Sequence, residues 1–204
     1  MATTKISSTK STSRAINYAE KRAVVKSSHN CDIDFAKSAF KITREVYGKT
    51  GGNQGHVVIQ SFKPGEVTPE QCNQLGLELA ERIAPNHQVA VYTHDDTDHV
   101  HNHIVINSID LETGKKFNNN KKALYDIRNA SDEICKKHNL SVPERNASMR
   151  YTQAEKGLIE KGKSSWKDEI RDAIEQSQAT NFEELERDLN QLDITIDRVT
   201  NKTI

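Results

Sequence analysis

A cluster of histidines is the feature that most restricts how this chain can fold. Five of its eight histidines fall within seventeen residues: His87, His94, His99, His101 and His103. Successive side chains of a β-strand point to opposite faces of the sheet, and the run HVHNHIVIN places a histidine at every second position. We therefore expect a strand over 99–109, with three histidines on one face and with Asn102, Ile104 and Ile106 on the other.

A second strand-like run, QVAVYTH at 88–94, is separated from His99 by four residues. The connection Asp95-Asp96-Thr97-Asp98 consists of turn-forming residues and has hairpin length. The two runs therefore predict a β-hairpin in which His94 shares a face with the other histidines.

Three or four imidazoles around one point predict a metal site. Neutral imidazole is a common ligand for Mn, Ni, Zn, Cu and Fe, and three histidines leave coordination positions open for catalysis. We expect Asp95, Asp96 and Asp98 to accept hydrogen bonds from the second ring nitrogens and so fix the tautomers. The alternative is an exposed strand whose histidines bind no metal.

The order of the remaining elements indicates an α+β domain, with a central antiparallel sheet and helices on one face. A capping box with proline at the first helical position, Thr68-Pro69-Glu70-Gln71, begins a helix that Pro85 ends. The other expected elements are a strand at 56–62 and helices at 12–27, from Asp32 or Asp34 to Val46, and at 120–138.

A mostly helical segment is expected at the C-terminal end of the chain. Helices open near Thr152, Ser165 and Asn181, Trp166 is expected in a core, and residues 194–199 resemble a strand. We divide the chain into a domain at 1–145 and a helical extension at 146–204, which is either an appendage or part of the same domain. The end, NKTI, has no evident cap, so we expect a longer native protein.

The formal net charge of zero hides an uneven distribution of charge. Residues 1–63 carry 11 basic and 4 acidic side chains, whereas residues 64–114 carry 1 and 9. Residues 115–167 carry 13 basic and 6 acidic side chains. Two basic segments on one face would attract a polyanion, although the lysines and arginines of 121–137 suit a solvated helix face equally well.

The cysteines and the hydropathy favour a cytoplasmic protein. Three cysteines at irregular spacing indicate neither a disulfide framework nor a zinc ribbon. The N-terminus has no apolar signal region, and no run of eighteen apolar residues occurs.

The run HDDTDHVHNHIVIN at 94–107 resembles the H-x-D-x-D-x-x-H-x-H-x-x-x-N signature of the HUH endonucleases, specifically the MobA/MobL-type plasmid mobilization relaxases of the P class. Asn102 stands where the family usually has a hydrophobic residue, at a position that points away from the metal. The resemblance implies that His94, His101 and His103 bind a divalent ion, Mn²⁺ or Mg²⁺, and that His99 does not.

Two further blocks are similar to relaxase motifs. RAINYAEKR at 14–22 resembles the first motif and implies that Tyr18 is the nucleophile. A phenol with a pKa of about 10 needs a cationic neighbourhood to react, which Arg14, Lys21 and Arg22 supply. HVVIQSFKPGE at 56–66 resembles the second motif, whose serine, here Ser61, contacts DNA. Tyr92, two residues from His94, is the alternative nucleophile.

The resemblance, over about residues 10–145, implies the HUH relaxase fold and strand-specific nicking of DNA at an origin of transfer. It also implies a 5′-phosphotyrosyl intermediate, rejoining of the strand after conjugation, and accessory relaxosome and coupling proteins as partners. One alternative is a replication initiator of the same superfamily. Others are a histidine-rich metal-dependent hydrolase and a protein that only binds DNA.

Overall fold

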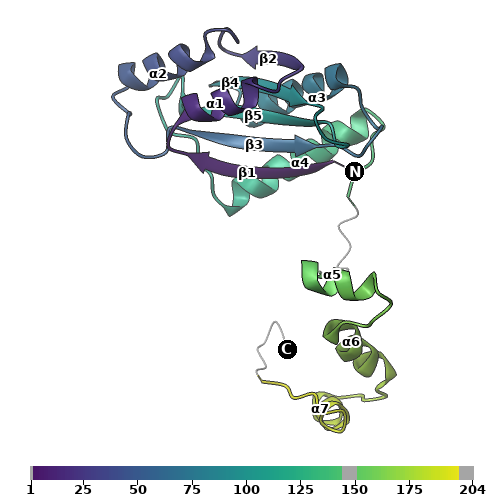
Figure 1. Ribbon diagram of the computed structural model, residues 1–204. Helices are drawn as coiled ribbons and strands as arrows, with labels where there is room; N and C mark the ends of the chain where they lie inside the picture. Colours follow the sequence, from purple (N-terminus) through teal and green to yellow (C-terminus); the bar gives the residue numbers. More distant parts are fainter. Residues whose placement is uncertain (1, 144–150, 198–204) are drawn as a thin grey trace. The chain divides into compact units, whose positions relative to one another are not determined.

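The structure is a computed structural model that describes residues 2–143 and 151–197. The chain divides into two compact units, residues 1–144 and 145–204, and each is treated by itself. The first unit is a single sheet with helices on both of its faces (Figure 1). That residues 1–145 form the catalytic domain stays a prediction.

Five strands form the sheet, in the spatial order β1-β3-β5-β4-β2. All neighbouring strands are antiparallel, as the sequence predicted. The strands are β1 (Thr3–Thr9), β2 (Val25–His29), β3 (Gly55–Ser61), β4 (His87–His94) and β5 (His101–Asp110). The histidine hairpin, β4 and β5, therefore lies at the centre of the sheet.

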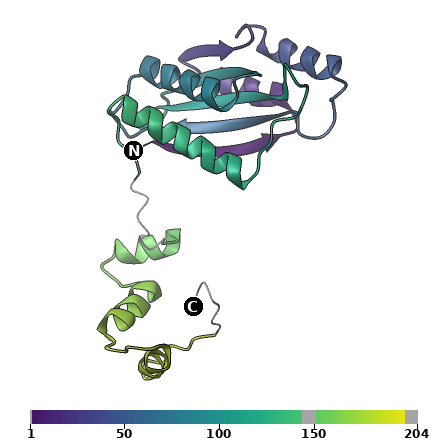
Figure 2. The same cartoon turned by 180° about the vertical axis from the view of Figure 1, so that it is seen from behind.

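Two helices cover each face of the sheet, which corrects the expectation of helices on one face only. Helices α1 (Thr12–Glu20) and α2 (Ala36–Val46) lie in front of the sheet in Figure 1. Helices α3 (Pro69–Ile83) and α4 (Lys121–Lys137) lie on the opposite face, seen from behind in Figure 2. Each face has its own apolar core.

The strand alternation predicted for β5 is confirmed. Ile104 and Ile106 pack in the core on the α3 and α4 face, and Val105 packs with Phe40 and Ile16 in the core on the other face. His101 and His103 share the face of Val105, because they lie four and two positions before it, respectively.

Local signals placed α3 and α4 correctly. The capping box is formed, since Thr68 accepts a hydrogen bond from the Gln71 amide and Gln71 accepts one from the Thr68 amide. Asn120 caps α4. Helix α2, by contrast, begins after Phe35, without a side-chain cap from Asp32 or Asp34.

The two edge strands were missed. β1 and β2 are short and polar, and their sequences, TTKISST and VKSSH, carry no strong strand signal. The region predicted as one helix over 12–27 divides into α1 and the beginning of β2. Pairing with β3 and β4 determines both strands, and that pairing is not visible in the local sequence.

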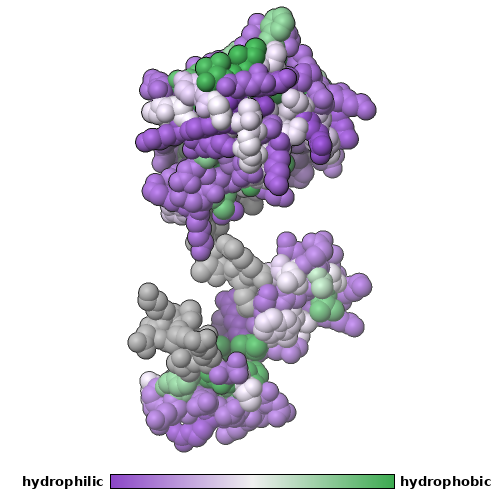
Figure 3. Space-filling view, turned by 90° about the vertical axis from the view of Figure 1, so that its left-hand side faces the viewer, coloured by the Kyte–Doolittle hydropathy of each residue, from purple (hydrophilic) through white to green (hydrophobic). Residues whose placement is uncertain are grey.

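The side of the molecule that Figure 3 shows is mostly hydrophilic, with hydrophobic side chains confined to small patches. Ile42 and Val46 are exposed apolar residues of α2. No helix in the described ranges combines the length and the apolar character needed to cross a bilayer.

The second unit contains α5 (Gln153–Ile159), α6 (Trp166–Gln176) and α7 (Phe182–Asn190). Their caps are Thr152, Ser165 and Asn181, as predicted. Trp166 was expected in a core but is 60% exposed. Residues 194–197 form no strand, and 198–199 lie outside the described residues.

Candidate active site

Three histidines meet where β4 ends and β5 begins. His94 and His101 face each other in the antiparallel register, and His103 follows two residues later on the same face. One ring nitrogen from each histidine lies within 4.8 Å of the others. The ring centroids are separated by 5.1 Å for His94 and His101, 4.5 Å for His94 and His103, and 5.3 Å for His101 and His103.

Backbone carbonyls fix the tautomers of two of these rings. Nε2 of His94 lies 2.6 Å from the Ala19 carbonyl, and Nδ1 of His101 lies 2.9 Å from the His99 carbonyl. A carbonyl oxygen can only accept, so each of these nitrogens carries the proton. Nδ1 of His94 and Nε2 of His101 therefore keep a lone pair for a metal ion.

His103 is also suited to metal binding. Burial lowers its pKa to about 4, with a further contribution from His94 and His101. The ring is therefore neutral near pH 7 and offers a lone pair. The three imidazoles thus offer a divalent cation three nitrogen ligands.

The neighbouring aspartates do not take the role expected of them. Asp96 accepts a hydrogen bond from Arg22 at 3.0 Å, and this bond is the main reason that the Asp96 pKa lies below its usual value. Asp95 and Asp98 are exposed. Within residues 2–143, none of the three aspartates forms a hydrogen bond to an imidazole of the cluster, and backbone carbonyls already occupy one nitrogen each of His94 and His101.

His99 lies outside the cluster. It precedes β5, and its Nδ1 donates a hydrogen bond to the Phe62 carbonyl at 2.7 Å. This position agrees with the expectation that His99 is not a ligand.

Tyr18 reaches the histidine cluster from helix α1. Ile16 and Ala19 are buried against the sheet, whereas Tyr18 stands at the edge of this contact and is 57% exposed. Its ring meets that of His103 edge-on, with 5.6 Å between centroids. The exposed tyrosine of the first motif therefore lies beside the candidate metal ligands.

Tyr92, the alternative nucleophile, is excluded by its position. It is fully buried in the core beneath α1 and α2, and its hydroxyl has no hydrogen-bond partner in the described part of the chain. Burial raises its pKa well above the usual value. A substrate phosphate cannot reach it.

A cavity of about 880 Å³ opens beside the cluster. Tyr18, His101, His103 and Ser61 all line it. Ser61 pairs with His101 across β3 and β5, so the two predicted motifs meet in space. Lys63 and Thr97 also line the cavity. Sequence reasoning missed both, because no local pattern separates them from ordinary surface residues.

The basic residues fall into two groups. Arg14, Lys21 and Arg22 are exposed around Tyr18. The lysines of α4 belong to the helix that covers the opposite face of the sheet (Figure 2), which favours a solvated helix face there.

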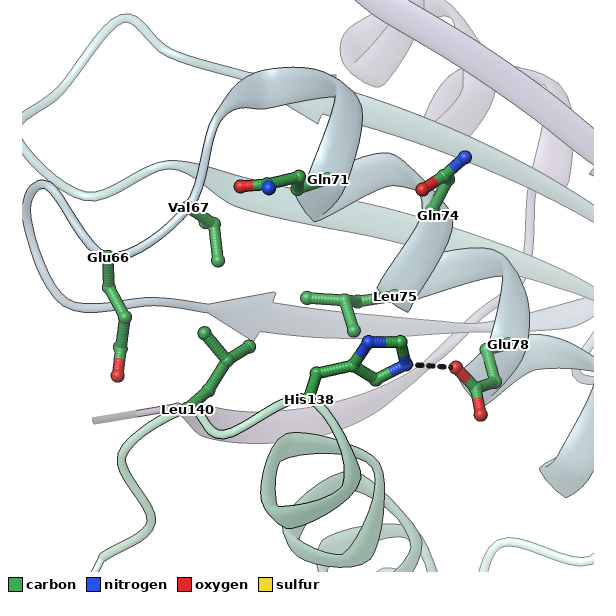
Figure 4. Close-up of a pocket in the computed structure, with 8 residues that line it drawn as sticks. All are labelled: Glu66, Val67, Gln71, Gln74, Leu75, Glu78, His138 and Leu140. Carbon is green, nitrogen blue, oxygen red and sulfur yellow. Dashed lines mark hydrogen bonds and ion pairs between the residues drawn. The ribbon is translucent and has the colours of Figure 1, made fainter.

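A smaller cavity of about 240 Å³ lies between α3 and the chain that follows α4 (Figure 4). Nε2 of His138 lies 2.9 Å from Oε2 of Glu78 at its edge, within hydrogen-bond distance, and Leu75 and Leu140 line it. Because α3 and α4 cover the face opposite the histidines, this cavity is separate from the site.

The family comparison matches the stretch of the chain that contains these motifs. The family model for the nuclease domain of MobA/VirD2-like relaxases matches residues 12–140. A "Protein rlx" from Staphylococcus aureus is 79% identical over all 204 residues, which make up 62% of that protein's length. The group II intron-interrupted relaxase LtrB of Lactococcus lactis subsp. cremoris is 28% identical over 82% of this chain and 32% of its own.

A solved structure supports the fold. The MobM relaxase domain, in a Mn-bound crystal structure with plasmid oriT DNA, aligns with a TM-score of 0.53 at 12% identity. The alignment covers 78% of this chain and 98% of that one.

Proposed function

The chain belongs to the MobA/VirD2-like relaxase family, and on this premise we propose that it is a plasmid mobilization relaxase that nicks one DNA strand at an origin of transfer. The position of Tyr18 carries the proposal. Its ring lies 5.6 Å from that of His103, and both line the cavity of about 880 Å³. A nucleophile and a candidate metal centre thus face the same space.

We propose that His94, His101 and His103 hold a divalent ion. Nitrogen ligands suit Mn²⁺ better than Mg²⁺, which prefers oxygen. When bound, the ion supplies positive charge that neutralises the scissile phosphate.

In the proposed step, the Tyr18 oxygen attacks phosphorus in line. A bond forms between this oxygen and phosphorus, and the bond from phosphorus to the 3′ oxygen breaks. The phenol releases its proton to solvent and the 3′ oxygen takes one up, leaving a 5′-phosphotyrosyl adduct and a 3′-hydroxyl. One phosphodiester is exchanged for another, so the reverse attack rejoins the strand after conjugation without ATP.

We propose that DNA lies across the open side of the cavity. Ser61 stands at its wall, and Arg14, Lys21 and Arg22 provide positive charge around the nucleophile. The catalytic domain is then residues 1–145, with 146–204 as a helical extension. Accessory relaxosome proteins and a coupling protein are the further partners that this activity requires, and the cytoplasm is its compartment.

The test is formation of a covalent adduct. The chain is incubated with an origin oligonucleotide and Mn²⁺ or Mg²⁺, and products are separated in SDS. We expect an SDS-stable adduct that Tyr18→Phe abolishes. If the wild type forms none with either ion, the proposal is wrong, and cleavage that survives Tyr18→Phe would indicate a hydrolase that uses water. Plasmid transfer from a donor strain separates a relaxase from a replication initiator.

A further inference from the structure

One ion pair connects the helix of the nucleophile to the hairpin of the metal ligands. Nη1 of Arg22, two residues after the end of α1, lies 3.0 Å from Oδ2 of Asp96, two residues after the end of β4. The guanidinium carbon of Arg22 lies 5.6 Å from the centroid of the Tyr18 ring. Asp96 therefore holds a permanent cation close to the nucleophile.

The position of Asp96 is not explained by the histidines. His94 and His101 already donate to the carbonyls of Ala19 and His99, so neither ring needs a carboxylate to fix its tautomer. The hydrogen bond that Asp96 does make is the one with Arg22, and its interaction with His94 and His101 is through charge alone.

We propose that Arg22 is a catalytic residue that stabilises the negative charge developing on the Tyr18 oxygen, and that Asp96 is the positioning residue that holds Arg22 there. This inference rests on the proposed function, since it assigns roles within the same tyrosine attack.

The chemistry of the attack explains why such a cation is needed. A neutral phenol is a weak nucleophile, so its attack requires stabilisation of the negative charge that develops on the oxygen. Guanidinium keeps its charge throughout and favours the face of an aromatic ring. As the bond to phosphorus forms and the phenol proton leaves for solvent, Arg22 neither gains nor loses a proton.

The other cations around Tyr18 are less constrained. Arg14 and Lys21 are exposed, and neither has an ion pair among residues 2–143. Their side chains remain free to follow the DNA backbone, whereas Arg22 is held by one specific carboxylate. Loss of Arg14 should therefore mainly weaken DNA binding, whereas loss of Arg22 should mainly slow adduct formation.

The experiment separates the chemical step from DNA binding. Single-turnover adduct formation is measured with the origin oligonucleotide and Mn²⁺, and DNA affinity is measured by fluorescence anisotropy. The variants are Arg22→Ala, Arg22→Lys, Asp96→Asn and the double variant Arg22→Ala/Asp96→Asn. Arg82→Ala is the matched control, because Arg82 pairs with Glu133 between α3 and α4 on the opposite face of the sheet.

Arg22→Ala is expected to slow adduct formation about 10- to 100-fold, at or below the usual loss for one preorganised donor. Its melting temperature should match that of Arg82→Ala, and its DNA affinity should fall far less than its rate, since Arg14 and Lys21 keep their positive charge beside the DNA. Arg22→Lys should recover part of the lost rate because it restores the charge. Asp96→Asn alone should slow adduct formation, but adding it to Arg22→Ala should not lower the rate further.

Two results would overturn the inference. The first is that the Arg22→Ala variant forms the adduct as fast as the wild type does. The second is an Asp96→Asn effect that persists in full without Arg22, which would mean that Asp96 acts on the metal site. In either case the wild type still forms its adduct, so the proposed function stands. A wild type that forms no adduct contradicts the proposed function itself.

Discussion

Asn102 and His103 are consecutive residues of β5 whose side chains point to opposite faces of the sheet. His103 belongs to the histidine cluster. Asn102 is fully buried on the other face, where it donates to Gln60 Oε1 at 3.1 Å and to the Cys72 carbonyl at 2.6 Å and accepts from the Thr93 hydroxyl at 2.7 Å. A buried polar network therefore supports, from behind, the strand that carries two of the candidate ligands.

Replacement of Asn102 by leucine should lower the free energy of unfolding. Leucine is the kind of residue the motif usually has here, but it removes the partner of two buried groups, the Gln60 Oε1 acceptor and the Thr93 hydroxyl donor, at a cost of about 1–3 kcal/mol per unsatisfied group. Urea denaturation measures the change. The control is Ile104→Val, a buried residue two positions along the same strand, with an expected loss of about 0.5–1.5 kcal/mol. An Asn102→Leu variant as stable as the wild type would contradict the role of the network.

Gly76 of α3 leaves the space that Asn102 occupies. A Cβ at this position would contact the Asn102 amide nitrogen and lie 2.7 Å from Asn102 Cγ and 3.0 Å from Val91 Cγ1. Since hydrogen bonds hold Asn102 in place, Gly76→Ala should destabilise the first unit by about 1–3 kcal/mol. Thermal unfolding followed by circular dichroism tests this. Gly157→Ala in α5, where a Cβ meets nothing within 4 Å, should not destabilise its own unit.

The sequence predicted those parts of the fold and site that depend on local patterns. The alternation in HVHNHIVIN was enough to place His101 and His103 opposite Ile104, and Thr68 and Asn120 marked where two helices begin. The polar edge strands β1 and β2 could not be predicted, because their strand conformation comes from pairing with β3 and β4.

The sequence could not predict the hydrogen-bond partners within the site. The Ala19 carbonyl that accepts the hydrogen bond from His94 is 75 residues away in the sequence. Every residue has a backbone carbonyl, so the residue type does not indicate which carbonyl accepts. The aspartates were therefore given a role that the backbone fulfils. The sequence predicted only that Arg22 supplies charge. Its ion pair with Asp96 could not be predicted, because the two residues are 74 positions apart and are brought together by the fold.

Tyr92→Phe should retain adduct formation. The Tyr92 hydroxyl is buried without a hydrogen-bond partner among the described residues, so its removal costs no hydrogen bond and relieves a desolvated polar group. We expect a melting temperature equal to or above that of the wild type. SDS gels and calorimetry on the same preparation provide both readouts, and loss of the adduct in a folded Tyr92→Phe protein would reassign the nucleophile.

His101→Ala should weaken Mn²⁺ binding strongly. Loss of a ligand should cost at least as much as loss of a residue that supports one, which is typically about 10- to 100-fold in metal affinity. Isothermal titration with Mn²⁺ measures the effect. His99→Ala is the matched control, because the His99 ring donates a hydrogen bond to the Phe62 carbonyl and lies outside the cluster. Equal losses in the two variants would argue against the three-histidine site.

Acidification should destabilise the first unit through His56 and His87. Burial lowers the pKa of both below 6.5, and their rings pack on Phe117 at 5.1 and 5.4 Å between centroids. Because the unfolded chain binds protons more readily at these positions, their contribution is complete above about pH 6.5 and declines as the pH falls toward the folded pKa values.

Melting temperatures of the wild type and of a His56→Gln variant, measured between pH 7 and pH 5, test this dependence. The variant should lose less stability than the wild type over this interval. Parallel curves would show that His56 binds protons equally well in the folded and unfolded states, which would contradict a folded pKa lowered by burial.

The hydrogen bond from His94 to the Ala19 carbonyl makes two equilibria interdependent. The carbonyl belongs to the helix that carries Tyr18, and the imidazole belongs to the candidate metal centre. An ion that orients the ring also favours the docked helix, and a docked helix preorganises the ring for the ion. By thermodynamic reciprocity, each event raises the equilibrium constant of the other by the same factor.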